Sequence, residues 1–430
     1  MRIRFIGHAC FVLEHAGIRI LSDPWFGGRV FQDGWDLYSP VTEGADSLVG
    51  VDYLWISHEH PDHFHIPTLR AIEPDRRSTM TVLFQQTIDR RVVEFCQGLG
   101  FGQIVELAPV WTPLGKGLDV YCASHTEGNS WIAFRTEDKA LLNLNDCGMR
   151  NLKELSEVKK IVGELDMLMT QFSYANWQGN PDQPELRVSA AIDKLEMVAF
   201  QCQSLEPKQV VLFASQMYFC HEENFFMNDE VNLPSTAVSS ISENTESKPI
   251  VLYNGESMDV GSQHATTASC ERYEQDLQNV LASGPWQDSH TESVSISRLE
   301  HEVETFLGRL SKDAPWYLRY LLRPAKVFLW DYGHSFSLAR TGIKRSEWKE
   351  SECDVALHSE SFLFCLEHRY GLDTLGVSGR MHKPVVGDYR NFYRYFRFGT
   401  IAMRGKPVGL RYIYKSVANA ILVQLGRREN

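Results

Sequence analysis

The chain has 430 residues, of which 43% are hydrophobic and 23% charged, so it is long enough for a large core and has the composition of a globular protein. Its formal net charge of −12 argues against a general nucleic-acid binder, which is usually basic. We expect a cytoplasmic protein, because the sequence shows no signal peptide or long apolar run, and its nine cysteines lack paired spacing.

The chain begins with three short strand-like runs, at residues 2–5, 10–13 and 18–21. Asp23 follows the last run, and two roles remain open for it. Its carboxylate could hold a histidine of a metal site, or it could cap the turn before Pro24. Two roles also remain open for His8 in Gly7-His8-Ala9. It could line a pocket, or it could be a hydrogen-bonded histidine of the core, and the sequence favours neither.

The densest group of potential ligands follows a buried strand predicted over residues 51–57. Residues two apart in an extended segment point the same way, so His58 and His60 should converge on one cation. Asp62 and His63 come after a proline turn and offer an oxygen and a nitrogen to a second cation. Imidazole with carboxylate favours zinc, iron or manganese over calcium and magnesium. The sequence therefore predicts one or two divalent metal ions, with zinc preferred.

Helices and strands should alternate through the rest of the first 233 residues. Helices are expected at 67–72, 88–99, 151–165 and 185–204, and strands at 81–84, 120–124, 131–134, 166–170 and 209–213. This alternation is typical of an α/β sandwich. His125 and Asp146 each end an apolar strand, and His221 comes soon after another, so all three are further candidate ligands.

The second half of the chain has a different character. Residues 234–248 are polar and predict a loop or linker, and residues 270–310 predict two helices. From residue 371 onward there are 11 Lys and Arg against 3 Asp and Glu. Residues 410–428 predict a basic amphipathic helix, which could bind a membrane surface peripherally, dock on the main domain or mediate self-association.

We therefore expect three regions: a catalytic core at 1–233, a linker with closing helices that could complete the core at 234–310, and a basic aromatic extension at 311–430.

The motif H-x-H-x-D-H after a buried strand resembles the signature of the metallo-β-lactamase superfamily. The resemblance implies a four-layer αββα sandwich of the α/β class, with a helical and mixed C-terminal extension and a one- or two-metal site at one edge of its sheets. It also implies a ligand set. One metal would bind His58, His60 and His125, the other Asp62, His63 and His221, with Asp146 between them. Asp62 and His221 would also take part in catalysis.

The Gly7-His8-Ala9 element resembles two branches of this superfamily, the ascorbate-6-phosphate lactonases and the N-acyl phosphatidylethanolamine phospholipases D. A narrower likeness, to the metallo-β-lactamase-like part of the CMP-N-acetylneuraminate hydroxylases, is carried by residues 23–35, 58–72, 140–147, 214–229 and 351–371. Those hydroxylases bind a Rieske cluster through Cys-x-His and Cys-x2-His. This chain has Cys365 and His368 but no Cys-x-His, so a cluster within the chain is not expected.

The expected function is a metal-dependent hydrolase that uses a metal-activated water on a small anionic substrate of the phosphodiester, lactone or sugar-nucleotide class. The basic C-terminal region would help to receive that anion. The alternative is a non-haem iron oxygenase acting on a nucleotide amino sugar, with a separate Rieske or ferredoxin protein as electron donor. His60 favours the hydrolase, because a glutamate there would suit iron better. A non-catalytic binding module is the third possibility, and the complete ligand set argues against it.

Overall fold

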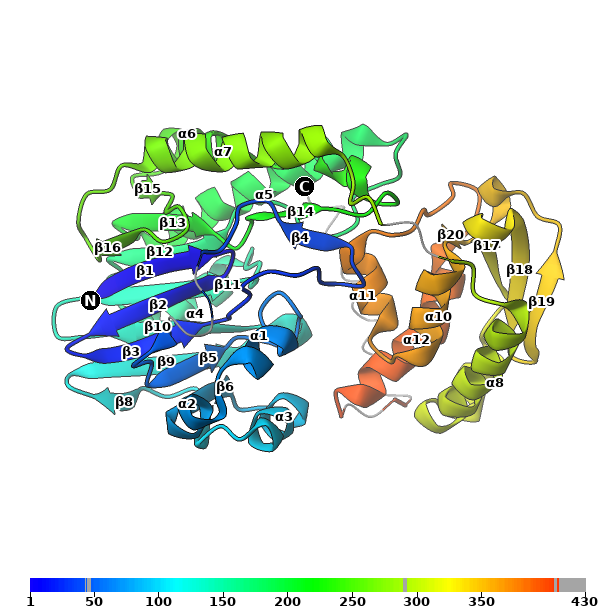
Figure 1. Ribbon diagram of the computed structural model, residues 1–430, viewed down its shortest axis with the longest axis horizontal. Coiled ribbons are helices and arrows are strands. Elements are labelled where there is room, and N and C mark those ends of the chain that lie inside the picture. Colours follow the sequence, from blue (N-terminus) through cyan, green and yellow to red (C-terminus); the bar gives the residue numbers. More distant parts are fainter. Residues whose placement is uncertain (43, 45–47, 289–291, 406–407, 410–430) are drawn as a thin grey trace. The chain divides into compact units, whose positions relative to one another are not determined.

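A computed structural model describes residues 1–42, 44, 48–288, 292–405 and 408–409. The chain forms two compact units, Met1–Trp286 and Gln287–Asn430 (Figure 1). Residues 234–286, from the predicted linker region, therefore belong to the first unit. The amphipathic helix predicted over residues 410–428 lies outside the described residues.

The first unit contains two seven-stranded sheets, ordered β16-β1-β2-β3-β5-β6-β7 and β15-β13-β12-β11-β10-β9-β8. The strands of the first sheet are β1 (Arg2–Gly7), β2 (Cys10–His15), β3 (Ile18–Ser22), β5 (Tyr53–Ile56), β6 (Thr81–Gln85), β7 (Gln103–Leu107) and β16 (Ser257–Asp259). Those of the second are β8 (Thr112–Gly115), β9 (Leu118–Ser124), β10 (Ser130–Arg135), β11 (Ala140–Asn145), β12 (Met167–Gln171), β13 (Gln209–Phe213) and β15 (Lys248–Ile250). Two short strands, β4 (Trp35–Leu37) and β14 (Met217–Phe219), pair separately.

Helices cover the outer faces of both sheets (Figure 1). The first sheet carries α1 (Ile66–Ala71), α2 (Pro74–Thr79) and α3 (Arg91–Leu99). The second carries α4 (Leu152–Val162), α5 (Pro184–Leu205), α6 (Pro234–Asn244) and α7 (Thr266–Ser283).

The alternation of side chains along β2 explains the layers. Phe11 points into the core between the sheets, where its ring lies 6.3 Å from that of Phe213. Cys10 and Val12 point the other way, into the core cluster that also contains residues of α1 and α3. The predicted four-layer αββα sandwich is therefore confirmed.

The prediction of a loop over residues 234–248 is wrong, because these residues form α6 and the start of β15. Pro234 occupies the first helical turn, where its missing N–H costs nothing. Ala237 and Ile241 lie four residues apart and are both fully buried in the main core. Two well-placed apolar side chains thus outweigh the low helix propensity of a serine-rich segment.

The second unit combines helices with a four-stranded sheet of order β19-β18-β17-β20. Its elements are α8 (Ile296–Asp313), α9 (Trp316–Tyr320), β17 (Ala325–Leu329), β18 (His334–Ala339), β19 (Gly342–Ser346), β20 (Val355–Leu357), α10 (Ser359–Glu367), α11 (Gly371–Ser378) and α12 (Tyr389–Met403). Phe306 of α8 stacks on Phe396 of α12 with ring centroids 4.7 Å apart, and this pair joins two helices of the unit's core.

Across the described part of the chain, none of the helices combines the length and the apolar character needed to cross a bilayer. All nine cysteines are buried with free thiols. Cys365 is buried within α10, and His368 ends that helix and stacks on Tyr370, so this pair has a structural setting.

Gly102 lies between α3 and β7, where two backbone segments meet. A Cβ at this position would lie 2.1 Å from the carbonyl oxygen of Ser78. We expect Gly102→Ala to lower the free energy of unfolding by about 1–3 kcal/mol, because the backbone must shift to admit the methyl group. Gly98→Ala is the matched control, because a Cβ there meets nothing within 4 Å. Urea denaturation should separate the two variants, and equal stabilities would contradict the packing argument.

Candidate metal centre

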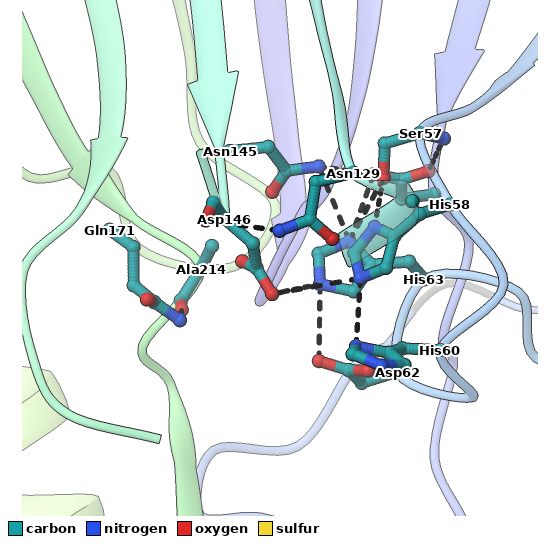
Figure 2. Close-up of polar contacts among 12 residues, drawn as sticks. Ser57, His58, His60, Asp62, His63, Asn129, Asn145, Asp146, Gln171 and Ala214 are labelled. Carbon is teal, nitrogen blue, oxygen red and sulfur yellow. Dashed lines mark hydrogen bonds and ion pairs between the residues drawn. The ribbon is translucent and has the colours of Figure 1, made fainter. Parts of the chain in front are cut away.

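The predicted metal loop follows directly from β5, at the carboxyl end of the parallel strands of the first sheet. Asp146 follows β11 in the second sheet and points toward this loop (Figure 2). Two groups of potential ligands have atoms within 4.8 Å of one another. One contains His58, His63 and Asp146, and the other contains His8, Asp62 and His63. His63 belongs to both groups.

Carboxylate oxygens lie between the imidazoles of this centre. Asp146 Oδ2 is 3.7 Å from His58 Nε2 and 3.4 Å from His63 Nε2. Asp62 Oδ2 is 3.1 Å from His63 Nε2 and 3.3 Å from His8 Nε2. His60 Nδ1 is 3.0 Å from His58 Nε2, which brings a third imidazole of the loop alongside (Figure 2). Residues from both sheets, including the turn between β1 and β2 of the first sheet, thus converge on one small volume.

Asp23 links the loop to its neighbours through four contacts of its carboxylate. Its carboxylate accepts hydrogen bonds from the Ser57 amide and hydroxyl at 2.8 and 2.7 Å and from Asn145 Nδ2 at 2.6 Å. It also lies 3.0 Å from His63 Nδ1. Of the two roles left open for Asp23, the structure therefore shows that of supporting a histidine. Sequence reasoning missed Asn145, and its only signal was a polar residue at the end of an apolar strand.

Four residues other than glycine have positive φ angles near the strand ends of this centre: His8 (48°), Asp23 (38°), Asn145 (50°) and Ala214 (51°). Such conformations cost of order 1–3 kcal/mol each and persist only where the surroundings enforce them. The backbone amide of Ala214 donates to the carbonyl of His8 at 3.0 Å, which fixes two of these residues against each other. Backbone strain is therefore concentrated around the candidate ligands.

The histidines and carboxylates of the candidate metal centre shift one another's pKa values. Burial alone would lower the pKa of His63, but Asp62 and Asp146 outweigh it and hold that pKa well above its usual value. Burial would raise the pKa values of Asp62 and Asp146, yet His63 keeps both well below the usual range. Burial, together with His63 and His60, lowers the pKa of His58. The mutual attraction of His63 and the two carboxylates thus shifts their pKa values in opposite directions.

Several buried atoms of the centre have no hydrogen-bond partner among the described residues: His8 Nδ1, Asp62 Oδ1 and Asp146 Oδ1. Buried polar atoms are rarely left unsatisfied, because each costs about 1–3 kcal/mol. Imidazole nitrogens and carboxylate oxygens together suit zinc, iron or manganese. The residues therefore fit a divalent cation, which would satisfy the open ligand atoms.

Three of the predicted ligands lie outside the two groups found among the described residues, namely His60, His125 and His221. His125 Nε2 lies 2.9 Å from Glu154 Oε1. His221 is buried, and its Nδ1 accepts a hydrogen bond from the Glu223 amide at 3.2 Å. Their roles as ligands stay predictions. His8, whose role was left open, lies fully buried against Asp62.

Comparison with known proteins extends these observations. Residues 2–170 match a family model described as a beta-lactamase superfamily domain. The chain is 29% identical over 164 residues to the cytidine monophosphate-N-acetylneuraminic acid hydroxylase of Mus musculus. This match covers 36% of the present chain and 28% of the mouse protein, so the chain spans less than a third of that relative's length.

Solved structures show more distant likenesses. An isothiocyanate hydrolase from Delia radicum gut bacteria is 14% identical with a TM-score of 0.44, and the match covers 60% of this chain and 99% of that one. CmlA, a diiron beta-hydroxylase from Streptomyces venezuelae, is 17% identical with a TM-score of 0.42, covering 60% and 53%. Residues 2–170 therefore match a beta-lactamase superfamily domain, and part of the chain is similar to a portion of the mouse hydroxylase.

Proposed function

We propose that this protein is a metal-dependent hydrolase that acts on a small anionic substrate of the phosphodiester, lactone or sugar-nucleotide class. Homology to the beta-lactamase superfamily supports metal-dependent catalysis. The observation that carries the proposal is the buried cluster of potential ligands around His63, in which Asp62 Oδ1 and Asp146 Oδ1 have no hydrogen-bond partner among the described residues. A site left without a cation would retain these atoms at a cost to stability and without benefit.

The side chains of the chain prepare this centre for a divalent cation. His58, His63 and Asp146 would hold it, with Asp62 adjacent and His60, His125 and His221 as further predicted ligands. When bound, such a cation acts as a Lewis acid and lowers the pKa of a water molecule toward neutrality.

Asp23 positions His63 so that the Nδ1 proton faces the Asp23 carboxylate and Nε2 faces the ligand cluster. Asp62, whose Oδ1 has no hydrogen-bond partner among the described residues, would accept a proton from the attacking water.

A second candidate is a non-haem iron oxygenase acting on a nucleotide amino sugar, with electrons from a separate Rieske or ferredoxin protein. It is favoured by the likeness to a hydroxylase over 36% of the chain. The absence of Cys-x-His from the sequence is the reason why a separate electron donor would be needed.

Metal analysis of the protein purified without added metal tests both candidates. We expect one to two equivalents of zinc and hydrolysis of bis(p-nitrophenyl) phosphate without O₂ consumption. His58→Ala should lose about half or more of the metal, because it removes a buried ligand atom. His301→Ala, an exposed histidine of α8, is the matched control and should bind metal like the wild type. Iron with reductant-dependent O₂ consumption would favour the oxygenase, and failure to bind either metal would refute both.

A further inference from the structure

Lys194, which is half-buried, and Arg150, which is exposed, form no ion pair with any residue that the structure describes. Lys194 of α5 donates from Nζ to Gln171 Oε1 at 2.5 Å, and Arg150, four residues after Asp146, donates from Nη2 to the carbonyl oxygen of Asp193 at 2.9 Å. Among the residues that the structure describes, neither cation has a carboxylate as a partner. Both are instead bound to neutral oxygens. Lys139 and Lys208, which lie close to other strands of this sheet, both pair with Asp166 instead.

Through its bond to Gln171, Lys194 lies at the same strand ends of the second sheet as Asp146. Gln171 ends β12, the parallel neighbour of β11, and Asp146 follows directly after β11. The Gln171 amide nitrogen donates to the Ala214 carbonyl at 3.1 Å, so its oxygen is turned toward Lys194. Figure 2 shows Gln171 and Ala214 on the side of Asp146 away from the histidines. An ammonium group has three donors, and Gln171 uses only one.

The surroundings of Lys194 are unfavourable for its charge. Burial lowers the pKa of Lys194 to about 8, Arg150 contributes in the same direction, and Asp146 opposes them. The negative charge of Asp146 acts on Lys194, but Asp146 is also a candidate metal ligand. Once a divalent cation takes up the charge of Asp146, less negative charge would remain to offset the repulsion between Lys194 and Arg150.

We propose that Lys194 and Arg150 form an oxyanion subsite that binds the phosphate or carboxylate group of the substrate beside the metal centre. The inference rests on the proposed function and specifies the substrate feature that the site recognises. Two adjacent cations with unused donors suit a group carrying several negatively charged oxygens. A substrate oxyanion would supply the negative charge that the protein itself does not provide at this position.

Isothermal titration of the full-length, zinc-loaded protein with inorganic phosphate tests this subsite, and titration with acetate distinguishes phosphate from carboxylate. Lys194→Met and Arg150→Met should each weaken binding of the preferred anion by about 10–100-fold, as expected for loss of a charged hydrogen bond. Lys194→Arg should retain most of the affinity, because it keeps the charge. Lys159→Met should leave it unchanged, because Lys159 already pairs with Glu206 on the surface.

This binding experiment does not depend on catalytic turnover, so failure of the anion subsite can be distinguished from failure of the proposed hydrolase function. Unchanged anion affinity in both methionine variants would overturn the subsite, as would a wild type that binds neither anion at about 10 mM. Metal content is measured on the same samples. If the protein takes up no metal but binds phosphate through Lys194, the proposed hydrolase fails while the subsite stands.

Discussion

Asp23→Ala is expected to weaken metal binding by about 10–100-fold, because it removes the group that orients His63. It should also lower the free energy of unfolding of the metal-free protein by about 3–5 kcal/mol, the usual effect of removing one partner from a buried ionic pair. The variant leaves the Ser57 amide, Asn145 Nδ2 and His63 Nδ1 without the carboxylate that they share. Zinc titration against a chelator and urea denaturation measure the two effects.

Two further variants sharpen this experiment. Asp23→Asn keeps the shape but presents an amide that competes with the His63 Nδ1 proton, so metal affinity should still fall while stability falls less. Asp52→Ala is the matched control, because Asp52 is exposed and accepts a hydrogen bond from the Arg19 amide at 2.9 Å. If Asp23→Ala and Asp52→Ala bound zinc equally well, Asp23 would have no role in positioning the ligand.

Metal affinity is expected to fall about tenfold for each pH unit below the raised pKa of His63 in the metal-free protein, because one proton must leave before Nε2 can bind an ion. Asp62 and Asp146 hold the pKa of His63 above its ordinary value, so this competition should already be present near neutral pH. Calorimetry in two buffers of different ionisation enthalpy should show release of about one proton for each bound ion. A pH-independent affinity between about pH 5.5 and 7.5 would contradict the assignment.

The same shifts determine how the stability of the metal-free protein depends on pH. The raised pKa of His63 contributes stability that is fully present below its unfolded value of 6.5 and is lost as the pH rises through the folded value. The lowered pKa values of Asp62 and Asp146 contribute stability that is present above 3.8 and is lost as the pH falls through their folded values. The protein freed of metal with a chelator should therefore lose stability in two pH ranges. One lies above the folded pKa of His63, and the other lies below the folded pKa values of Asp62 and Asp146.

Much of the first unit follows from local sequence patterns. The hairpin of β1 to β3 and the strand β5 have strong alternation or continuous apolar runs, and α3 ends at Gly100 in a left-handed conformation, as its glycine predicts. Helix α6 was missed because its burial depends on contacts with α5 and α7 that no local pattern reveals. The sheet of the second unit was also missed, because its strands β18 and β19 are only partly buried and mix polar with apolar residues.

The site shows the same division between local and long-range information. His58, Asp62 and His63 were identified because they are adjacent in one motif, and Asp146 because it ends a strand in the order that the resemblance implies. Lys194 and Gln171 gave no such signal, since they belong to a helix and a strand end that meet only in the folded chain. A lysine on a helix usually faces solvent, and only the tertiary structure shows that this one is half-buried and bonded to Gln171.

The burial of every cysteine has a practical consequence. Seven thiols lie in the first unit and two, Cys353 and Cys365, lie in the second, and all of them are shielded in the native chain. Alkylating reagents act on exposed thiolates, and burial raises the pKa of several of these thiols as well. Alkylation of a cysteine should therefore show that the unit containing it has unfolded. The position of the alkylated cysteine identifies which of the two units this is.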